Sequence, residues 1–123
     1  MEVCWIEHKG KKILVTDFTG IKLEKGMINL LNSCLPLVEA LPKGSTILNF
    51  IDLTGCFTTP GFLDAARKFE KEVLTHYDVK RAVLGITGPK EILLKGFNLI
   101  VKRKLAPFHS RTDALDYLIS DKD

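Results

Sequence analysis

Two aspartates follow apolar, strand-like runs in the same local pattern, and their carboxylates are the groups of this chain best placed to do chemistry. Ile13 to Thr16 leads into Asp17-Phe18-Thr19-Gly20, and Ile47 to Ile51 leads into Asp52-Leu53-Thr54-Gly55. Where two such strands are neighbours, the carboxylates meet at one edge of the sheet, as an acid and a base or as ligands of a cation.

The same pattern also suits a tight turn, because the carboxylate accepts nearby backbone N–H groups and glycine tolerates a positive φ. We favour the turn, since no third ligand, histidine or nucleophile stands beside either aspartate in the sequence. We therefore predict no catalytic residue, no metal and no cofactor. The strand-end turn residues are Asp17, Thr19, Asp52 and Thr54.

The segment Thr58-Thr59-Pro60-Gly61 opens a predicted helix. Thr59 suits the N-cap position and Pro60 the first helical position. The free N–H groups of a helix start also favour an anion, so the threonines could hold a phosphate, although Pro60 removes one donor. We favour the cap and keep Thr58, Thr59 and Gly61 as the phosphoacceptor or partner loop.

A predicted helix from Lys90 to Lys102 is apolar on more than one face, whereas a surface helix needs one apolar stripe. The apolar surface beyond that one stripe must be covered by the last helix, a dimer partner or a ligand such as an acyl chain. The adjacent Lys102-Arg103-Lys104 suits an anionic lipid headgroup. We expect the ligand or interface residues to be Leu94, Phe97, Leu99, Val101, Lys102 and Arg103. Leu94 and Leu99 lie off the main stripe and are expected to face a partner or a ligand cleft rather than water.

Hydrophobic periodicity and turn residues predict the elements that position these groups. The expected strands are Val3–Glu7, Lys12–Thr16, Ser45–Ile51, Lys80–Ile86 and Lys104–Phe108. Helices are expected over Leu23–Leu41, kinked or split at Pro36, and from Pro60, from Pro89 and from Ser110 to Leu118. A hairpin turn at His8 to Lys11 joins the first two strands, and His8 is expected to be solvated. This order predicts an α/β fold with a mixed, mostly parallel sheet, an N-terminal β-hairpin and about four helices.

Composition limits the classes of protein. The chain has 123 residues, 46% hydrophobic and 27% charged, which suits one folded domain over residues 1–123. It lacks an apolar run of about 20 residues and an N-terminal targeting pattern, so we expect no transmembrane segment and a cytoplasmic location. The three cysteines have no metal-site spacing and are expected to be buried thiols. A net charge of +3 is too small to indicate a nucleic-acid partner.

The hairpin start, the alternating units and the stretch from Asp52 to Phe62 resemble the SpoIIAA-like proteins. These belong to the STAS superfamily of anti-sigma-factor antagonists and sulfate-transporter C-terminal domains. More narrowly, the stretch from Ile13 to Gly20 is similar to that of the small bacterial STAS/SEC14-type domain proteins. The resemblance covers essentially the whole chain and implies a SpoIIAA-like fold.

The resemblance also implies a function. In the antagonists, a serine of an Asp-Ser-Ser-Gly motif is phosphorylated by a partner kinase; aligned on Gly61, this chain has Thr58 and Thr59 before Pro60, with no Asp. SEC14-like relatives bind lipids in an apolar cleft. We therefore expect a non-enzymatic regulatory or protein-interaction domain with a protein partner, as a monomer or a homodimer. The alternative is a small-ligand or lipid-binding module that uses the apolar third helix, and a hydrolase built on Asp17 and Asp52 comes third.

Overall fold

The computed structural model describes residues 2–121. Its strands are β1 (Glu2–His8), β2 (Lys11–Asp17), β3 (Thr46–Asp52), β4 (Asp78–Leu84) and β5 (Leu105–Phe108). Its helices are α1 (Glu24–Glu39), α2 (Pro60–Glu72), α3 (Pro89–Ile100) and α4 (Arg111–Ile119), with a 3₁₀ turn over Leu74–His76. The five strands form one sheet in the order β1-β2-β3-β4-β5, in which only the β1–β2 pair is antiparallel. The predicted α/β fold with an N-terminal hairpin and four helices is confirmed.

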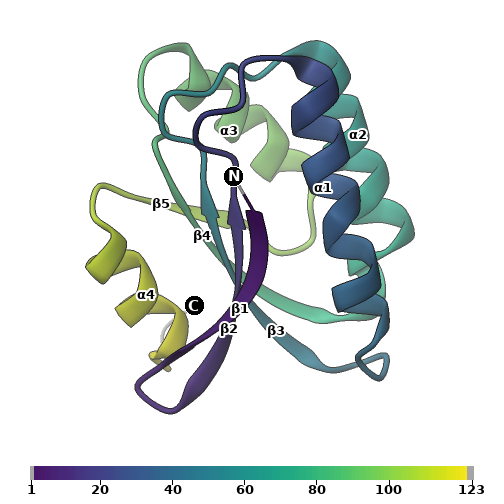
Figure 1. Ribbon diagram of the computed structural model, residues 1–123, viewed down its shortest axis with the longest axis vertical. Helices are drawn as coiled ribbons and strands as arrows, with labels where there is room; N and C mark the ends of the chain where they lie inside the picture. Colours follow the sequence, from purple (N-terminus) through teal and green to yellow (C-terminus); the bar gives the residue numbers. More distant parts are fainter. Residues whose placement is uncertain (1, 122–123) are drawn as a thin grey trace.

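The sheet order decides which face each helix covers. Strands β2 to β5 are parallel, and each lies on the same side of the strand that precedes it in the chain. Right-handed crossovers therefore bring the helices that connect them to the same face of the sheet. Figure 1 shows α1, α2 and α3 on that face and α4 alone on the other. The expectation that the last helix could cover the surplus apolar surface of α3 is therefore wrong, because the sheet lies between α3 and α4.

Local chemistry explains where several elements begin. Lys9 and Gly10 both have a positive φ, of 49° and 86°, as a two-residue hairpin turn of the mirror-image type requires. The Thr59 hydroxyl accepts the Phe62 N–H and Pro60 is the first residue of α2. The Ser110 hydroxyl accepts the Asp113 N–H at the start of α4. These turn and cap predictions are confirmed.

Two details differ from the sequence-based expectation. Helix α1 runs through Pro36 as one helix, so the split that we considered is wrong, whereas the alternative of a kink stays a prediction; the proline lies in the last turn and removes only one helical hydrogen bond. His8 is not a solvated turn residue: its Nε2 lies 2.9 Å from Oδ1 of Asp116 on α4. The hairpin is thereby tied to the helix that covers the far face of the sheet.

Alternate strand residues supply two cores, one on each face of the sheet. Phe50 and Ala82 pack with Leu115 and Leu118 beneath α4. The other face packs against α1 and α2, where the rings of Phe18 and Phe62 meet edge to face at 5.4 Å. Cys34 and Cys56 are buried as free thiols, whereas Cys4 is only half-buried. No helix of residues 2–121 is both long and apolar enough to cross a membrane.

Candidate functional site

The two Asp-x-Thr-Gly segments form matching turns at the carboxyl ends of neighbouring strands. Asp17 pairs directly with Asp52 in the parallel β2–β3 register. Asp17 Oδ1 accepts the Thr19 N–H at 2.9 Å, and Asp52 Oδ1 accepts the Thr54 N–H at 3.0 Å. The glycines that close the turns, Gly20 and Gly55, have φ values of 84° and 74°. The turn prediction is confirmed, and one oxygen of each carboxylate is engaged within its own turn.

The environment of Asp17 favours its charged form. Burial acts against that form, but hydrogen bonds from the Thr19 side chain and backbone outweigh it and hold the pKa of Asp17 below its ordinary value of 3.8. Among residues 2–121, no group of three His, Cys, Asp or Glu side chains is placed to hold a metal ion. The two aspartates are thus arranged as turn-capping groups.

The loop before α2 is fastened to the start of α1. Thr59 accepts the Phe62 N–H at 3.2 Å and donates its own hydroxyl hydrogen to Glu24 Oε1. Gly61 lies so close to the same carboxylate that a Cβ there would overlap with Glu24 Oε1. Thr59 therefore joins the start of α2 to α1, Gly61 leaves room for the Glu24 carboxylate, and Thr58 lines an adjacent cavity.

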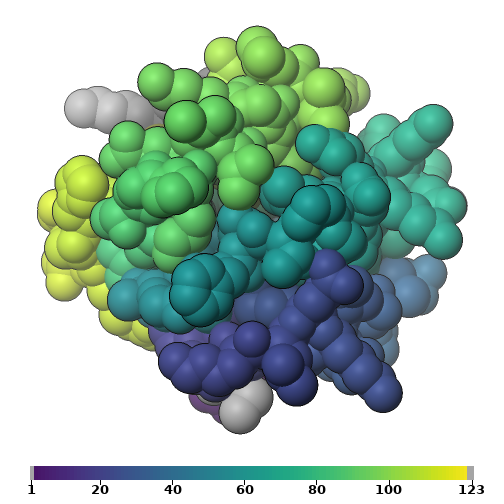
Figure 2. Space-filling view, turned by 90° about the horizontal axis from the view of Figure 1, so that it is seen from above, coloured from purple at the N-terminus to yellow at the C-terminus, as the bar shows by residue number. Residues whose placement is uncertain are grey.

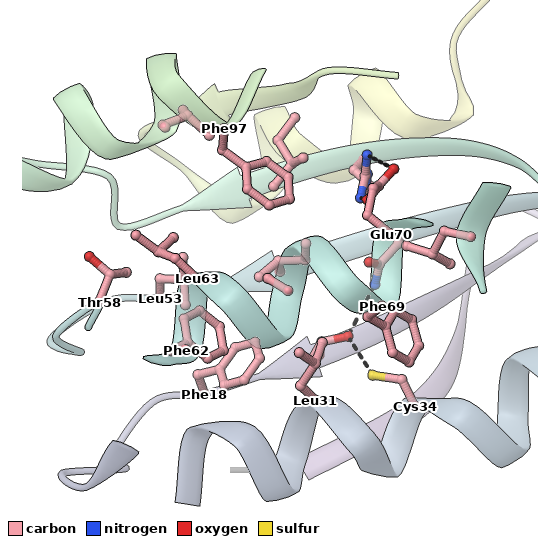
Figure 3. Close-up of a pocket in the computed structure, with 18 of the residues that line it drawn as sticks. Phe18, Leu31, Cys34, Leu53, Thr58, Phe62, Leu63, Phe69, Glu70 and Phe97 are labelled. Atoms are coloured by element: carbon pink, nitrogen blue, oxygen red, sulfur yellow. Dashed lines mark hydrogen bonds and ion pairs between the residues drawn. The ribbon is translucent and has the colours of Figure 1, made fainter. Parts of the chain in front are cut away.

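That cavity lies between the sheet and helices α1, α2 and α3 and has a volume of about 110 Å³. We call it the apolar cavity; its lining includes Phe18, Leu53, Phe62, Leu63, Ala66, Phe69, Leu93, Leu94 and Phe97. In Figure 3, Phe97 points from α3 into the space above α2, with Thr58 at one end of the cavity and Glu70 at the other. Figure 2 looks onto the carboxyl ends of the strands and shows a hollow between the green α3 and the teal α2. A cavity of this size is comparable to the roughly 150 Å³ protein cavity that takes up benzene or xenon.

One wall of the apolar cavity carries a buried ion pair. Arg81 of β4 is 3% exposed and donates from both terminal nitrogens to the carboxylate of Glu70 on α2. Its Nη2 also donates to the Arg103 carbonyl at 2.5 Å. In the part of the chain that the structure describes, Arg81 Nε is buried without a hydrogen-bond partner. Both residues of the pair line the cavity.

A second polar group lies in the floor of the cavity. The Asn49 amide donates to the Leu14 carbonyl at 2.9 Å and to the Thr16 hydroxyl at 3.1 Å. The Cys34 sulfur lies 3.6 Å from the same hydroxyl. Burial raises the pKa of the Cys34 thiol, so this sulfur stays protonated and unreactive near neutral pH.

A basic groove of about 430 Å³ lies beyond the ion pair, lined by Arg67, Lys71, Lys102 and Arg103. Two of its cations have acidic partners: Arg67 lies 3.1 Å from Asp64, and Arg103 lies 2.5 Å from Asp78. The groove and the apolar cavity share Glu70 in their linings. The groove is therefore less positive than its basic residues alone suggest.

The structure separates the residues expected on the third helix into three groups. Leu94 and Phe97 line the apolar cavity. Val101, Lys102 and Arg103 line the basic groove. Leu99 is 86% exposed and lies in neither lining. The side-chain alternation along β2 and β3 directs Asp17 and Asp52 to the α4 face, so they do not meet the cavity on the other face.

Sequence reasoning missed the ion pair. The signal was present: Asn49 lies in an apolar run, and Arg81 shares its face of β4 with the apolar residues Val79 and Val83. A charge at such a position is buried only with a partner, which predicts an acidic residue on a covering helix. Glu70 was one of several acidic residues on α2, and only the packing of α2 on β4 selects it.

Comparisons with known proteins bear on the fold. No protein-family model and no curated protein matches the chain. A solved structure of an uncharacterised protein from Shewanella loihica PV-4, of the DUF3478 family and with a SpoIIAA-like fold, is similar to it with a TM-score of 0.62. The identity is 19%, and the match covers 94% of this chain and 91% of that one. The chain thus has a SpoIIAA-like fold, as predicted.

Proposed function

We propose that this STAS-type domain is a non-enzymatic binding module that takes up a small apolar molecule in the apolar cavity. The supporting observation is the cavity itself: about 110 Å³ of space between the sheet and helices α1, α2 and α3, lined largely by aromatic and aliphatic side chains. Such a space loses dispersion contacts while it is empty and regains them when an apolar group enters. The proposal takes up the ligand-binding alternative that the apolar third helix suggested.

The size of the cavity limits the ligand. A molecule of about six or seven heavy atoms fits, such as one aromatic ring or a short acyl chain. The ceiling of about 1.5 kcal/mol per heavy atom would allow a submicromolar dissociation constant, but only the best small ligands reach it, so we expect dissociation constants from micromolar to millimolar. A longer acyl chain needs α3 to move away from the sheet, or must leave through the hollow between α2 and α3 in Figure 2.

Titration with benzene and methylenecyclohexane, followed by amide chemical shifts in NMR spectra, tests the proposal. We expect saturable shifts at residues that line the cavity, such as Phe62 and Phe97. Ala66→Leu places extra carbon in the cavity and should abolish the shifts. Ala65→Leu is the matched control, because Ala65 lies beside it on α2 but outside the lining. Absence of saturable shifts in the wild type, or equal effects of the two substitutions, would refute the proposal.

A second candidate function is protein interaction, as expected of an antagonist-like regulatory domain in the cytoplasm. Its support is a set of large apolar side chains open to solvent: Leu23, Phe57, Ile92, Leu99 and Ile100. Three of them lie on α3, and exposed apolar side chains that gather on one surface favour a partner. Light scattering after gel filtration distinguishes a homodimer from a monomer, and Leu99→Lys should return a dimer to the monomer.

A further inference from the structure

The geometry points to the ligand class of the apolar cavity: an apolar molecule that carries one uncharged oxygen acceptor, which binds the Nε–H of Arg81. This inference rests on the proposed function, because it specifies which molecules the same cavity prefers. It concerns the end of the cavity where Glu70 lies, opposite Thr58 (Figure 3), because Arg81 is paired with Glu70 there.

The first step is the count of donors on Arg81. A guanidinium has five N–H groups. Nη1 and Nη2 donate to Glu70, and Nη2 donates also to the Arg103 carbonyl. Within residues 2–121, Nε is left without an acceptor, although Arg81 is only 3% exposed. Buried N–H groups are almost always paired, so an unpaired one on a residue of the cavity wall marks a position for an acceptor. Nε itself is covered, so a ligand oxygen reaches it only after a small shift of the side chains over it.

The second step is the charge of the wall. Glu70 neutralises Arg81 through two parallel hydrogen bonds, and its side chain is only 14% exposed. A carboxylate or phosphate ligand would bring a second negative charge beside the Glu70 oxygens in a site from which water is largely excluded. The Lys90 ammonium keeps its charge, but it donates to the Leu53 carbonyl at 3.0 Å, and Leu53 lies near Thr58, at the other end of the cavity from Glu70 (Figure 3). A ketone, aldehyde, ester or alcohol oxygen pairs with Nε and adds no charge.

Two ligands of the same shape isolate this contact. Cyclohexanone and methylenecyclohexane differ only in an oxygen replaced by a CH₂ group. Their dissociation constants are measured by NMR titration for the wild type and for the Glu70→Leu/Arg81→Met double variant. Replacing both members of a buried ion pair with apolar residues is generally tolerated, whereas removing one is not. The free energy of removing the ketone from water is the same for both proteins. It therefore cancels when the ratio of the two dissociation constants in the wild type is compared with the ratio in the double variant.

We expect the preference for cyclohexanone over methylenecyclohexane to be about tenfold greater in the wild type than in the double variant. Cyclohexanecarboxylate should bind the wild type at least tenfold more weakly than the ketone. The inference is overturned if both proteins prefer cyclohexanone to the same degree, or if cyclohexanecarboxylate binds the wild type more tightly than the ketone does. In either case, binding of methylenecyclohexane would still support the proposed function. Failure of all three molecules to bind the wild type overturns both.

A measurement on the wild type alone keeps the test independent of the variant's folding. The Arg81 Nε–H resonance of the ¹⁵N-labelled protein should move downfield with cyclohexanone, because a hydrogen bond forms there, and not with methylenecyclohexane. An equal movement with both molecules contradicts the inference.

Discussion

Gly85, directly after β4, packs against the backbone of Thr54 in the second Asp-x-Thr-Gly turn. A Cβ built on Gly85 would overlap with the Thr54 nitrogen, and the φ of Gly85 is 89°. The adjacent Leu53 N–H donates to the Leu84 carbonyl at 2.9 Å. The end of β4 therefore packs against, and is hydrogen-bonded to, the turn that follows β3. This contact fixes the relative position of the loops that lead into α2 and α3.

Gly85→Ala should be among the most destabilising substitutions in the chain. It adds a backbone clash to a left-handed conformation, so we expect a loss of at least about 3 kcal/mol in the free energy of unfolding. Gly10→Ala is the matched control, with a φ of 86° and open space around its Cβ, and should cost about 1 to 2 kcal/mol. Urea denaturation of both variants measures the difference, and equal losses would show that the contact with Thr54 is unimportant.

Asp52→Asn should have a small effect, because asparagine keeps the oxygen that accepts the Thr54 N–H. We expect a loss of about 1 kcal/mol in the free energy of unfolding, measured by urea denaturation. Asp52→Ala removes the acceptor and should cost more. Failure of the Asp52→Asn variant to fold, or a metal ion found on both aspartates, would contradict the role of Asp52 as a turn residue.

The contact between the hairpin and α4 should depend on pH. Hydrogen bonds from His8 and Lys9 hold the pKa of Asp116 below its ordinary value of 3.8. When the pKa of a carboxyl group is lower in the folded protein than in the unfolded chain, its charged form stabilises the fold. This stabilisation is complete at a pH above the pKa of the unfolded chain, and it is lost as the pH falls through the pKa of the folded protein. The melting temperature of the wild type should therefore exceed that of Asp116→Asn at pH 6, and the difference should shrink as the pH falls below about 3.8. A difference that stays constant down to about pH 2.5 would contradict this assignment.

Two leucines on α3 should respond differently to the same substitution. Leu94 is half-buried and lines the apolar cavity, whereas Leu99 is exposed. Leu94→Lys should abolish binding of methylenecyclohexane and leave the monomer folded, since the long side chain can carry its charge to solvent. Leu99→Lys should leave ligand binding unchanged and alter the free energy of unfolding by at most about 0.5 kcal/mol. Unfolding of the Leu94 variant would instead assign that residue to the core.

The loop before α2 offers a prediction about modification. A phosphate on Thr58 would add about two negative charges near the start of α2, where the helix dipole favours them, at one end of the apolar cavity (Figure 3). Mass spectrometry after incubation with ATP and lysate of the host would detect it. If both threonines stay unmodified while Thr59→Ala costs about 1 kcal/mol and Thr59→Ser costs less, the loop acts only as a helix cap.

Features that depend on a few neighbouring residues could be predicted from the sequence. The turn at Lys9 and Gly10, the caps at Thr59 and Ser110 and the bonds of Asp17 and Asp52 each join groups within a few positions. The sheet followed from the order of these elements, because parallel neighbours with right-handed crossovers leave few arrangements.

Features that depend on packing between distant segments could not be predicted. The pairing of Glu70 with Arg81 needs α2 to lie over β4 at one particular rotation. The contact of His8 with Asp116 joins residues 108 positions apart. The cavity is a space left between the sheet and three helices, so no single stretch of sequence encodes it.

The placement of α4 alone on one face also bears on how the chain folds during synthesis. Each of α1, α2 and α3 can dock as soon as the strands it connects exist, but α4 follows all five strands. Ile13 and Phe50 leave the ribosome long before Leu118, their partner in the same core. Until residues 111–119 emerge, the nascent sheet presents one bare apolar face, and this is the stage at which a holding chaperone would matter most and premature association would be most damaging.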